Sequence, residues 1–392
     1  MPVVKLEAIR LMDPRCTEKD EITSTLVLLA NGLDKSESAA AWQVPSRAME
    51  ALVKFRPTEA ARVVSAFALA HPAWQVRAAA ARVAAALKDE GTLLKLASDR
   101  EPNVRTEVVT GLAQMKSQHT AQTAVAALRS DDHQLVRAAA IALKGYTEPQ
   151  IAAPALLQTL SRLTTTAADN SRDARMAILD RFKEFARSEL PGITLLPYVT
   201  VADLQPFLHD YDPNIAAATA DLIGVVTGVR PDPVPTHRAA QQPAGLDFFR
   251  LPGHAVILLD NGDRIALRLL PDEAPLAVAR FAELASRRYY DGLTFHRVVP
   301  LFVIQGGSRG ANEYVGDDRF MRDEIGFERH TRGAVGLSTR GRDTGDAQFF
   351  IDLTDQPRLN YDYSIFARVE SGMDAVDAVL EGTKIRSLTV SR

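Results

Sequence analysis

The sequence predicts a multidomain protein in which an all-α repeat array precedes a mainly-β domain. Three observations carry this prediction. Residues 1–228 are rich in alanine and leucine and repeat one helical layout. Residues 229–245 contain four prolines and no apolar periodicity, which predicts a stiff, extended linker. Residues 246–392 change to short alternating runs, which are typical of half-buried strands. We therefore expect a repeat array, a linker and a β domain with these bounds.

The N-terminal array is recognised by segments that share one layout. Each has a short polar or proline-containing lead-in, then an arginine, then an apolar-rich helix, as in AWQVRAAAARVAAAL and EPNVRTEVVTGLAQM. Looser copies follow at Arg175 and, without the arginine, at 212–224. Periods of this size with two helices per unit predict a solenoid, whose units bury their apolar faces only against neighbours. The four closest copies place their arginines 30, 28 and 32 residues apart, at Arg47, Arg77, Arg105 and Arg137.

The repeat pattern resembles HEAT repeats of the short bacterial type, in which the second helix opens with a Val-Arg pair. The recurring arginine has two interpretations. It could line a basic groove for a ligand, or it could form a structural hydrogen bond or ion pair between successive repeats. Residues 1–245 carry 27 Lys and Arg against 27 Asp and Glu, and this balance favours the structural interpretation. We expect the array to bind protein partners.

The C-terminal domain is expected to begin with a hairpin. The runs HAVILLD and DRIALRLL are joined by Asn261-Gly262, the strongest short signal for a two-residue turn. A helix is expected over residues 272–287, with Pro275 in its first turn. Because strands dominate and no regular βαβ alternation occurs, a closed antiparallel barrel with two helices is predicted. The remaining expected elements are short strands at 294–306, 333–338, 347–353 and 364–369, a helix at about 372–380 and a closing strand at 384–390.

Composition and charge exclude several classes of protein. The net charge is −3, so no basic surface for nucleic acid is expected. The single cysteine, Cys16, excludes a disulfide within the chain, and no apolar run approaches the ~18 residues that span a bilayer. The N-terminus MPVVKLEAIRLMDPR lacks the apolar region of a signal peptide. We therefore expect a cytoplasmic protein without membrane insertion; a periplasmic or secreted protein is the alternative if the native N-terminus is longer.

The stretch TFHRVVPLFVIQGG, at 294–307, contains the most informative residue of the β domain. Arg297 lies inside an apolar run, directly after His296, and Gln305 and two glycines end the run. Together with DAQFFIDL and YSIFARVESGMDAVDAV, this stretch closely resembles the cyclophilins, the peptidyl-prolyl cis/trans isomerases. The resemblance covers residues from about 250 to 391. It implies an eight-stranded antiparallel barrel capped by two helices.

The chemistry of this family explains an arginine in an apolar strand. Rotation about a peptide bond has a barrier of ~18–20 kcal/mol, because the nitrogen lone pair is delocalised into the carbonyl. Before proline the cis form is only slightly disfavoured, so the rate is limiting. Since no covalent bond breaks, neither a metal nor a cofactor is expected. A rigid, permanently charged guanidinium can meet the prolyl nitrogen in the twisted transition state, where a preorganised donor contributes ~3–4 kcal/mol.

The resemblance assigns roles residue by residue. Arg297 matches the catalytic arginine, and Gln305 matches the glutamine that hydrogen-bonds the substrate backbone and steadies the arginine. His296 matches the histidine before the arginine, and the reaction does not require it as a proton shuttle. The positions expected to line the proline pocket and its rim are Phe302, Val303, Phe350, Leu359 and Tyr363. The segment LSTRGRDTGDAQFF is shorter than in the family, and its candidate substrate contacts are Thr339, Arg340 and Gly341.

Several positions depart from the usual family pattern. Val303 stands where methionine is common, which shortens the side chain but keeps the pocket apolar. Tyr363 stands where many members have a histidine. Arg358 replaces the tryptophan associated with tight cyclosporin binding, so catalysis should survive while cyclosporin binding should be weak. The glycine-rich loop is altered to GGSRGANEYVGDD, and the acidic run GDDRFMRDE lacks the alternating ligand spacing of a calcium loop, so no metal is expected.

The leading interpretation is a two-domain bacterial isomerase of class EC 5.2.1.8. Its cyclophilin domain would act on X-Pro bonds of polypeptide clients in protein folding, as a chaperone-type rotamase, while the repeats recruit or hold those clients. The alternative is a scaffold that binds proline-containing segments and whose turnover is incidental. The matches at Arg297, Gln305 and Phe350 favour the enzyme, whereas the altered segment Thr339–Asp346 leaves the scaffold open. Nucleic-acid binding by the repeats is disfavoured by their neutral charge.

Overall fold

The computed structural model describes residues 2–35, 41–188, 194–236 and 250–392. They form two compact units. The repeat unit contains the described residues of 12–35, 44–188 and 194–236. The sheet unit contains residues 2–11, with helix α1 (Pro2–Leu11), residues 41–43 and residues 250–392. Residues 237–245 of the predicted linker lie outside the described residues.

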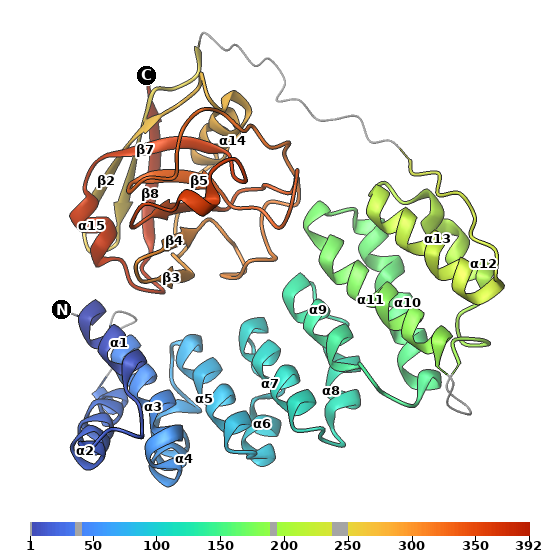
Figure 1. Cartoon of the computed structure of the whole chain (residues 1–392), viewed down its shortest axis with the longest axis horizontal. Helices are drawn as coiled ribbons and strands as arrows, with labels where there is room; N and C mark the ends of the chain where they lie inside the picture. The colour runs from blue at the N-terminus through green and yellow to red at the C-terminus, as the bar shows by residue number, and fades with distance from the viewer. Residues whose placement is uncertain (1, 36–40, 189–193, 237–249) are drawn as a thin grey trace. The chain divides into compact units, whose positions relative to one another are not determined.

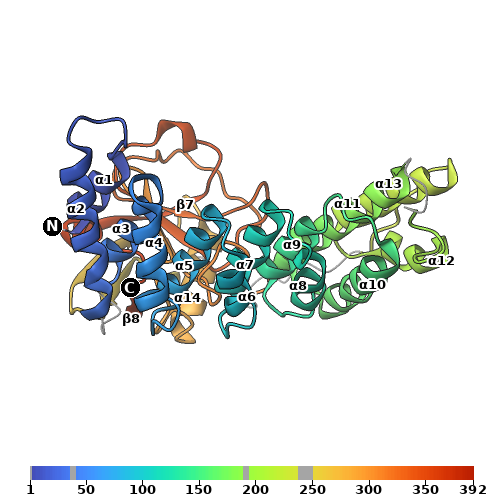
Figure 2. The ribbon, with the colours of Figure 1, turned by 90° about the horizontal axis from the view of Figure 1, so that it is seen from below.

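The repeat unit is an array of helix pairs, as predicted (Figure 1). The helices of the recurring segments from Arg77 onward stack in one row: α5 contacts α7, α7 contacts α9, α9 contacts α11, and α11 contacts α13, whose segment lacks the arginine. Figure 2 shows this row from below, running through the blue and green part of the ribbon. The helices of this unit are α2 (Lys19–Ala30), α3 (Gln43–Phe55), α4 (Pro57–Val63), α5 (Trp74–Ala86), α6 (Glu90–Leu96), α7 (Pro102–Gln114), α8 (Thr120–Ala127), α9 (His133–Ala142), α10 (Pro149–Thr166), α11 (Arg172–Arg187), α12 (Val201–Leu204) and α13 (Pro213–Thr227).

Local sequence explains where these helices begin and how closely they pack. Pro102 and Pro213 occupy first-turn positions, where a missing N–H costs nothing. The Asp132 carboxylate accepts a hydrogen bond from the backbone N–H of Leu135 at 2.9 Å and so caps α9. A Cβ on Gly111 of α7 would lie only 2.8 Å from the Cβ of Ala85 on α5. The small residues of the array therefore allow neighbouring helices to approach closely.

The recurring arginine has a structural partner at Arg77. Its Nε and Nη2 donate to the two carboxylate oxygens of Asp99 at 2.6 and 2.9 Å, and its Nη1 donates to the carbonyl of His71 at 2.7 Å. Both side chains of the ion pair are buried. Asp99 also accepts the backbone N–H of Glu101, just before helix α7. The pair therefore links one repeat to the next, which confirms the structural interpretation at this position.

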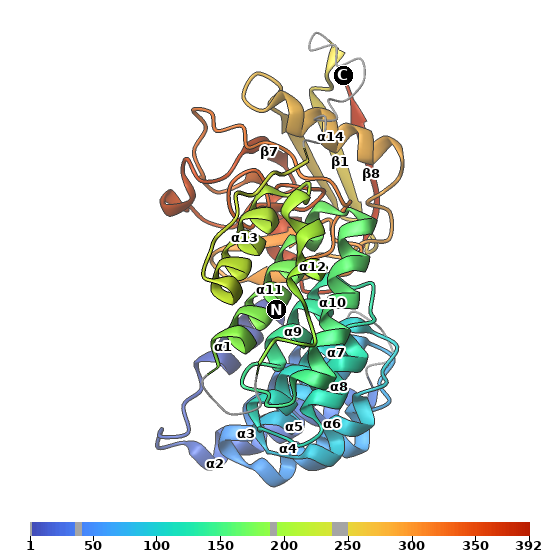
Figure 3. The ribbon, with the colours of Figure 1, turned by 90° about the vertical axis from the view of Figure 1, so that its right-hand side faces the viewer.

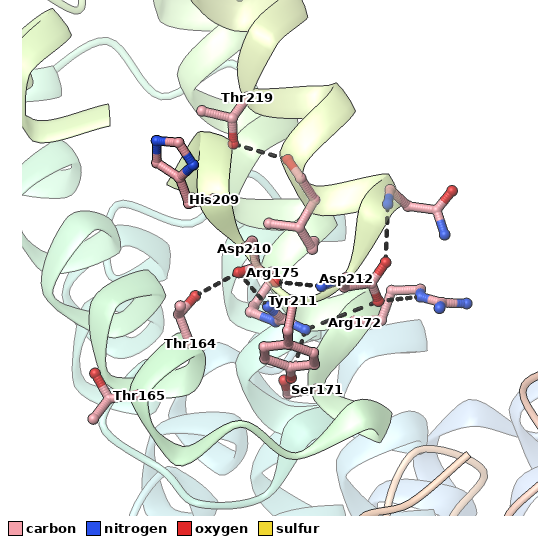
Figure 4. A network of polar contacts seen from close by, with 12 residues as sticks. Thr164, Thr165, Ser171, Arg172, Arg175, His209, Asp210, Tyr211, Asp212 and Thr219 are labelled. Carbon is pink, nitrogen blue, oxygen red and sulfur yellow. Dashed lines mark hydrogen bonds and ion pairs between the residues drawn. The ribbon is translucent and has the colours of Figure 1, made fainter. Parts of the chain in front are cut away.

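Arg175 repeats this arrangement at full burial (Figure 4). Its Nη1 lies 2.6 Å from the Asp210 carboxylate, and its guanidinium lies over the ring of Tyr211. Asp210 accepts the backbone N–H of Asp212 at 2.8 Å, just as Asp99 accepts that of Glu101. At Arg47 the pair is different: it is an exposed ion pair with Glu50 on the same helix. The ion pair between repeats thus occurs at Arg77 and Arg175 and not at Arg47.

Residues 229–236, the described part of the predicted linker, run along the last repeat. The backbone N–H of Val234 donates to the carbonyl of Leu208 at 3.0 Å. The Thr236 hydroxyl donates to the carbonyl of His209 at 2.8 Å. These residues have no helical or strand structure, so this part is extended, and it is hydrogen-bonded to the repeat unit.

The sheet unit holds eight strands in its described residues, and they form one curled antiparallel sheet (Figure 1). The strand order is β3-β4-β6-β5-β7-β2-β1-β8. The end strands β3 and β8 share no ladder within the described residues, so a closed barrel is not confirmed. Instead, residues 292–295, which precede β3, hydrogen-bond to residues 382–385, which end at the first residue of β8. The strands are β1 (His254–Leu259), β2 (Arg264–Leu269), β3 (Arg297–Val299), β4 (Val303–Gly306), β5 (Ala334–Leu337), β6 (Phe349–Asp352), β7 (Ile365–Ser371) and β8 (Ile385–Ser391).

Two helices pack on this sheet, as expected. Helix α14 (Pro275–Ser286) contacts β7 and β8, and Figure 3 shows it beside β8; α15 (Met373–Ala378) contacts β2. Phe281 of α14 packs against Phe349 and Phe366, with ring centroids 5.7 and 5.1 Å apart. This aromatic cluster fills one face of the sheet and leaves the opposite face of β3, β4, β5 and β6 for the candidate site. None of the described helices is long and apolar enough to cross a membrane.

The strand expected at 294–306 is instead a hairpin. β3 and β4 are separated by a turn at residues 300–302, where Leu301 has a φ of +59°. Pro300 at the start of this turn cannot donate a ladder hydrogen bond, which explains why the apolar run breaks there. The register of the hairpin places Arg297 directly opposite Gln305.

Candidate active site

Four residues form a row across four neighbouring strands. Arg297 on β3 pairs with Gln305 on β4, Gln305 pairs with Phe350 on β6, and Phe350 pairs with Gly336 on β5. Residues directly opposite one another in an antiparallel pair share a face of the sheet. The sheet therefore brings the predicted catalytic arginine, the glutamine and the predicted pocket phenylalanine together on one face.

The Arg297 guanidinium is held from three sides. Its Nη1 donates to Gln305 Oε1 at 3.5 Å, and its Nε lies 3.3 Å from Glu313 Oε1. Its central carbon lies 5.7 Å from the centroid of the Phe302 ring. The side chain remains 37% exposed, which leaves it accessible to a substrate. The guanidinium is thus a partly exposed hydrogen-bond donor with limited freedom to reorient.

Gln305 links the arginine to the interior of the sheet unit. Its side chain is buried, and its Nε2 donates to Ser338 Oγ at 2.9 Å and to Gln348 Oε1 at 3.2 Å. Gln348 in turn donates from Nε2 to the backbone carbonyl of Glu313 at 3.2 Å. Because both amide groups are fixed by hydrogen bonds, the Oε1 of Gln305 is oriented toward Arg297.

Phe350 is enclosed by aromatic rings and by a glycine. The His330 ring stacks on it with centroids 5.6 Å apart, and the Tyr363 ring meets it edge-on at 5.5 Å. A Cβ on Gly336 would lie 2.4 Å from Cζ of Phe350, so only glycine leaves room for the ring on the neighbouring strand. His330 is itself fixed by Asp352, whose Oδ2 lies 2.8 Å from its Nδ1. The predicted pocket residues Phe350 and Tyr363 are therefore in contact.

His296 lies beside the arginine as an uncharged imidazole. Burial lowers its pKa to about 4, and the nearby positive charge of Arg297 adds to this effect, although the backbone at Thr294 opposes it. At neutral pH the ring is therefore a neutral imidazole and not an imidazolium.

The remaining predicted pocket residues lie on β4, on the turn before it and on a short helix after β6. Val303 is buried and pairs with Asp352 across the sheet. Phe302 carries the Arg358 guanidinium on its ring, 4.4 Å from the centroid. Leu359 is half-buried at the end of the 3₁₀ helix Pro357–Leu359, directly after Arg358. The Arg358 guanidinium therefore lies against the predicted pocket residue Phe302.

The segment of Thr339, Arg340 and Gly341 is a loop after β5. Thr339 is half-buried, and Gly341 has a φ of +105°, which favours glycine. The Arg340 guanidinium lies over the rings of Tyr314 and Phe320, and its Nη1 donates to the backbone carbonyl of Glu313. Arg340 thus contacts the altered glycine-rich loop rather than Arg297.

The acidic residues near this loop form no metal site. Within the described residues, no three His, Cys, Asp or Glu side chains converge as metal ligands. Asp317 instead forms an ion pair with Arg280 of α14. Asp346 is buried, and burial raises its pKa to about 7; the carboxylates of Asp317 and Asp318 add to this effect, while Arg340 and the backbone N–H of Gln348 oppose it.

Sequence reasoning missed five residues that support the site: Glu313, His330, Gly336, Gln348 and Asp352. Gln348 and Asp352 lie in the quoted motif DAQFFIDL, so a polar residue before and after the two phenylalanines was the available signal. The other three lie in segments whose contacts depend on strand pairing. No local pattern in the sequence indicates that His330 faces Asp352 or that Glu313 faces Arg297.

Comparison with known proteins agrees with this geometry. The model of the family "Cyclophilin type peptidyl-prolyl cis-trans isomerase/CLD" matches residues 255–390, the span from β1 to β8. The chain is 38% identical over 135 residues to peptidyl-prolyl cis-trans isomerase B of Bacillus subtilis, an alignment that covers 34% of this chain and 94% of the relative. The chain belongs to the cyclophilin family. A second relative, the peptidyl-prolyl cis-trans isomerase of Helicobacter pylori, is 32% identical to this cyclophilin over 164 residues, which cover 41% of this chain and 97% of the relative.

The part of this cyclophilin that lies outside the isomerase match is also recognised. The HEAT-repeat family model matches residues 61–144 and 91–180, which contain α5, α7 and α9. The expected combination of HEAT repeats with a cyclophilin domain is thereby confirmed.

Proposed function

We propose that the cyclophilin domain, residues 246–392, isomerises X-Pro bonds of polypeptide clients with Arg297 as its catalytic residue. The observation that supports this most directly is the row of Arg297, Gln305 and Phe350 across three strands. The row combines a charged donor, a backbone-binding amide and an apolar ring on one face. These are the groups that a rotation without bond breakage can use.

In this mechanism the prolyl ring packs on Phe350, Phe302 and Val303, with Leu359 and Tyr363 at the rim. Gln305 and backbone groups near Thr339 and Arg340 hold the substrate main chain. As the peptide bond twists, the prolyl nitrogen becomes pyramidal and accepts a hydrogen bond from the Arg297 guanidinium. Because this bond forms mainly in the transition state, it lowers the barrier rather than the ground state. His296 packs beside the arginine as a neutral ring.

The HEAT repeats, residues 1–228, serve in this proposal as a module that binds client or partner proteins. The ion pairs at Arg77 and Arg175 support a structural role for these arginines, since both are paired with carboxylates within the array. A groove built on them for nucleic acid is therefore disfavoured. A role in protein folding follows if the clients are unfolded chains. Cyclosporin should bind weakly, because Arg358 occupies the tryptophan position.

The test is an NMR-exchange assay on an Ala-Pro peptide with the full-length chain and with residues 246–392. We expect both proteins to accelerate isomerisation, since the site row lies wholly within the sheet unit. An active full-length chain with an inactive but folded fragment would assign part of the site to the repeats. Peptide binding without acceleration by either protein would replace the enzyme with the scaffold interpretation.

A further inference from the structure

Glu313 contacts the catalytic guanidinium from a loop that carries no predicted site residue. Its Oε1 lies 3.3 Å from Nε of Arg297, whereas Gln305 Oε1 faces Nη1 of the same group at 3.5 Å. The carboxylate therefore faces Nε as an ion-pair partner, and the amide oxygen accepts a hydrogen bond from Nη1. An ion pair at one nitrogen and a hydrogen bond at another limit the orientation of the planar group.

The loop around Glu313 has a defined backbone conformation. Asn312 Oδ1 accepts the backbone N–H groups of both Tyr314 and Val315 at 3.0 Å. Ser308 Oγ donates to the carbonyl of Val315 at 2.6 Å and accepts the N–H of Asn312 at 3.1 Å. Ser308 and Asn312 are buried. Glu313, which follows Asn312, has a side chain that is 46% exposed. The loop thus fixes the main chain of Glu313 and presents its carboxylate.

The same loop is connected to the site by a second route. Gln348 Nε2 and Arg340 Nη1 both donate to the backbone carbonyl of Glu313. Gln348 Oε1 accepts from Gln305, which accepts from Arg297. Arg297, Gln305, Gln348 and Glu313 therefore form a closed ring of polar contacts. In such a ring, each side chain limits the orientation of the next.

We propose that Glu313 is a positioning residue that orients Arg297 for prolyl isomerisation. With Nε held by Glu313 and Nη1 by Gln305, the rest of the guanidinium edge faces the prolyl nitrogen. This inference rests on the proposed function of Arg297. It assigns a role to the altered segment GGSRGANEYVGDD, because that segment supplies the carboxylate.

The main test is a double-mutant cycle on the full-length protein, with kcat and KM measured for an Ala-Pro peptide. Glu313→Ala should lower kcat about 10-fold with KM nearly unchanged, since a misplaced catalytic group mainly affects the transition state. Glu313→Gln keeps an acceptor and should recover most of the loss. In the Arg297→Ala background, Glu313→Ala should cause no further loss, because Glu313 acts only through Arg297.

The matched control is Asp377→Ala. Asp377 forms an ion pair with Arg332 at 2.6 Å, and its side chain is 46% exposed, as is that of Glu313. This variant should keep wild-type kcat. Wild-type or raised kcat in Glu313→Ala would overturn the proposal, and so would an equal loss in the two Arg297 backgrounds, which would indicate a general structural effect.

An NMR measurement separates this inference from the proposed function. Nitrogen-15 relaxation at Arg297 Nε should show a more ordered guanidinium in the wild type and in Asp377→Ala than in Glu313→Ala. Equal order in all three proteins would overturn the positioning role whatever the activity. If the wild type shows no isomerase activity while its guanidinium is ordered by Glu313, the proposed function fails and the contact stands.

Discussion

His330 Nδ1 lies 2.8 Å from Asp352 Oδ2, and both side chains are fully buried behind Phe350. Burial raises the pKa of Asp352, although the hydrogen bond from His330 opposes this effect. Asp352 and Phe350 lie on the same strand, two residues apart, so they share a face of the sheet. The pair therefore supports the ring on which we expect the substrate proline to pack.

Replacing this histidine should weaken peptide binding. His330→Ala removes the ring that stacks on Phe350, so KM for an Ala-Pro peptide should rise about 5- to 10-fold, the equivalent of one aromatic contact of about 1–1.5 kcal/mol. His330→Phe keeps a stacked ring but leaves Asp352 without its partner, so stability should fall while KM stays near wild type. Steady-state kinetics beside thermal melting tests both. Equal KM values for His330→Ala and wild type would show that the ring does not support the pocket.

Arg297 should act mainly on turnover. Arg297→Ala should lower kcat/KM by roughly 10²–10³, the contribution of one preorganised charge-assisted donor, with little change in ground-state peptide affinity. Arg297→Lys should recover only part, because an ammonium group lacks the planar set of donors. Catalytic efficiency per folded molecule, measured beside thermal stability, decides the matter. A stable Arg297→Ala protein with near-native efficiency would contradict the catalytic assignment.

Gly336 should be as important as the phenylalanine it faces. Gly336→Ala places a methyl group 2.4 Å from Cζ of Phe350, so the ring must move. We expect this variant to lose peptide affinity and turnover together, as Phe350→Ala should. Gly253→Ala is the matched control, because a Cβ at Gly253 meets nothing within 4 Å. Peptide titration by NMR would show the loss, and unchanged affinity in Gly336→Ala would mean that the Phe350 ring is not part of the binding face.

The recurring arginines should differ in their contribution to stability. Arg77→Ala leaves Asp99 buried without its partner and should destabilise the repeat unit by about 3–5 kcal/mol. Arg47→Ala removes an exposed pair with Glu50 and should cost less than about 1 kcal/mol. Urea unfolding of both variants in a Trp42→Phe background, followed by the fluorescence of Trp74 at the start of α5, provides the measurement. Similar losses in both variants would mean that burial does not distinguish the two pairs.

Asp346 should make the sheet unit less stable as pH rises. Burial raises its pKa from 3.8 to about 7, so the folded protein holds this proton more tightly than the unfolded chain. The stability gained from the protonated form is present below about pH 4 and is lost as pH rises to about 7. The free energy of unfolding therefore falls by about 4 kcal/mol over this pH range.

Asp346→Asn should remove this pH dependence and raise stability at pH 8. Hydrogen–deuterium exchange of peptides from β4 to β7, measured with urea at pH 5 and pH 8, reports on the sheet unit alone. The expectation fails if the wild type and the variant lose the same stability between these two pH values.

The sequence was sufficient for most elements because their signals are local. Alternating runs around Asn261-Gly262 predicted the hairpin of β1 and β2, and alanine-rich periodicity predicted the helices of the array. Pro300 indicated a turn within 294–306. Because the residues around it are mostly apolar, this segment was predicted as strand without the turn. Whether the sheet closes depends on contacts between 292–295 and 382–385, which no local pattern encodes.

The candidate site divides in the same way. Arg297 was noticeable because a charge interrupts an apolar run, and Gln305 because it ends that run. The ion-pair partners Asp99 of Arg77 and Glu313 of Arg297 could not be predicted. Both acidic residues lie on loops, and an ion pair between distant segments produces no periodic pattern in the sequence. Asp210 shows this most clearly, since it lies 35 residues from Arg175 and in a repeat that lacks the arginine.

The pairing of Arg297, Gln305, Phe350 and Gly336 makes the site a property of strand register. Inserting one residue inside β4 or β6 would turn every following side chain of that strand to the opposite face of the sheet, and the site residues would no longer share one face. By contrast, residues 308–332 connect β4 to β5 outside the ladder, so their length can change without shifting the register of the four paired residues, provided that Glu313 and His330 keep their contacts with Arg297 and Phe350. Variation in substrate preference among related chains should therefore accumulate in that connection, while the paired strands tolerate substitution far more readily than insertion.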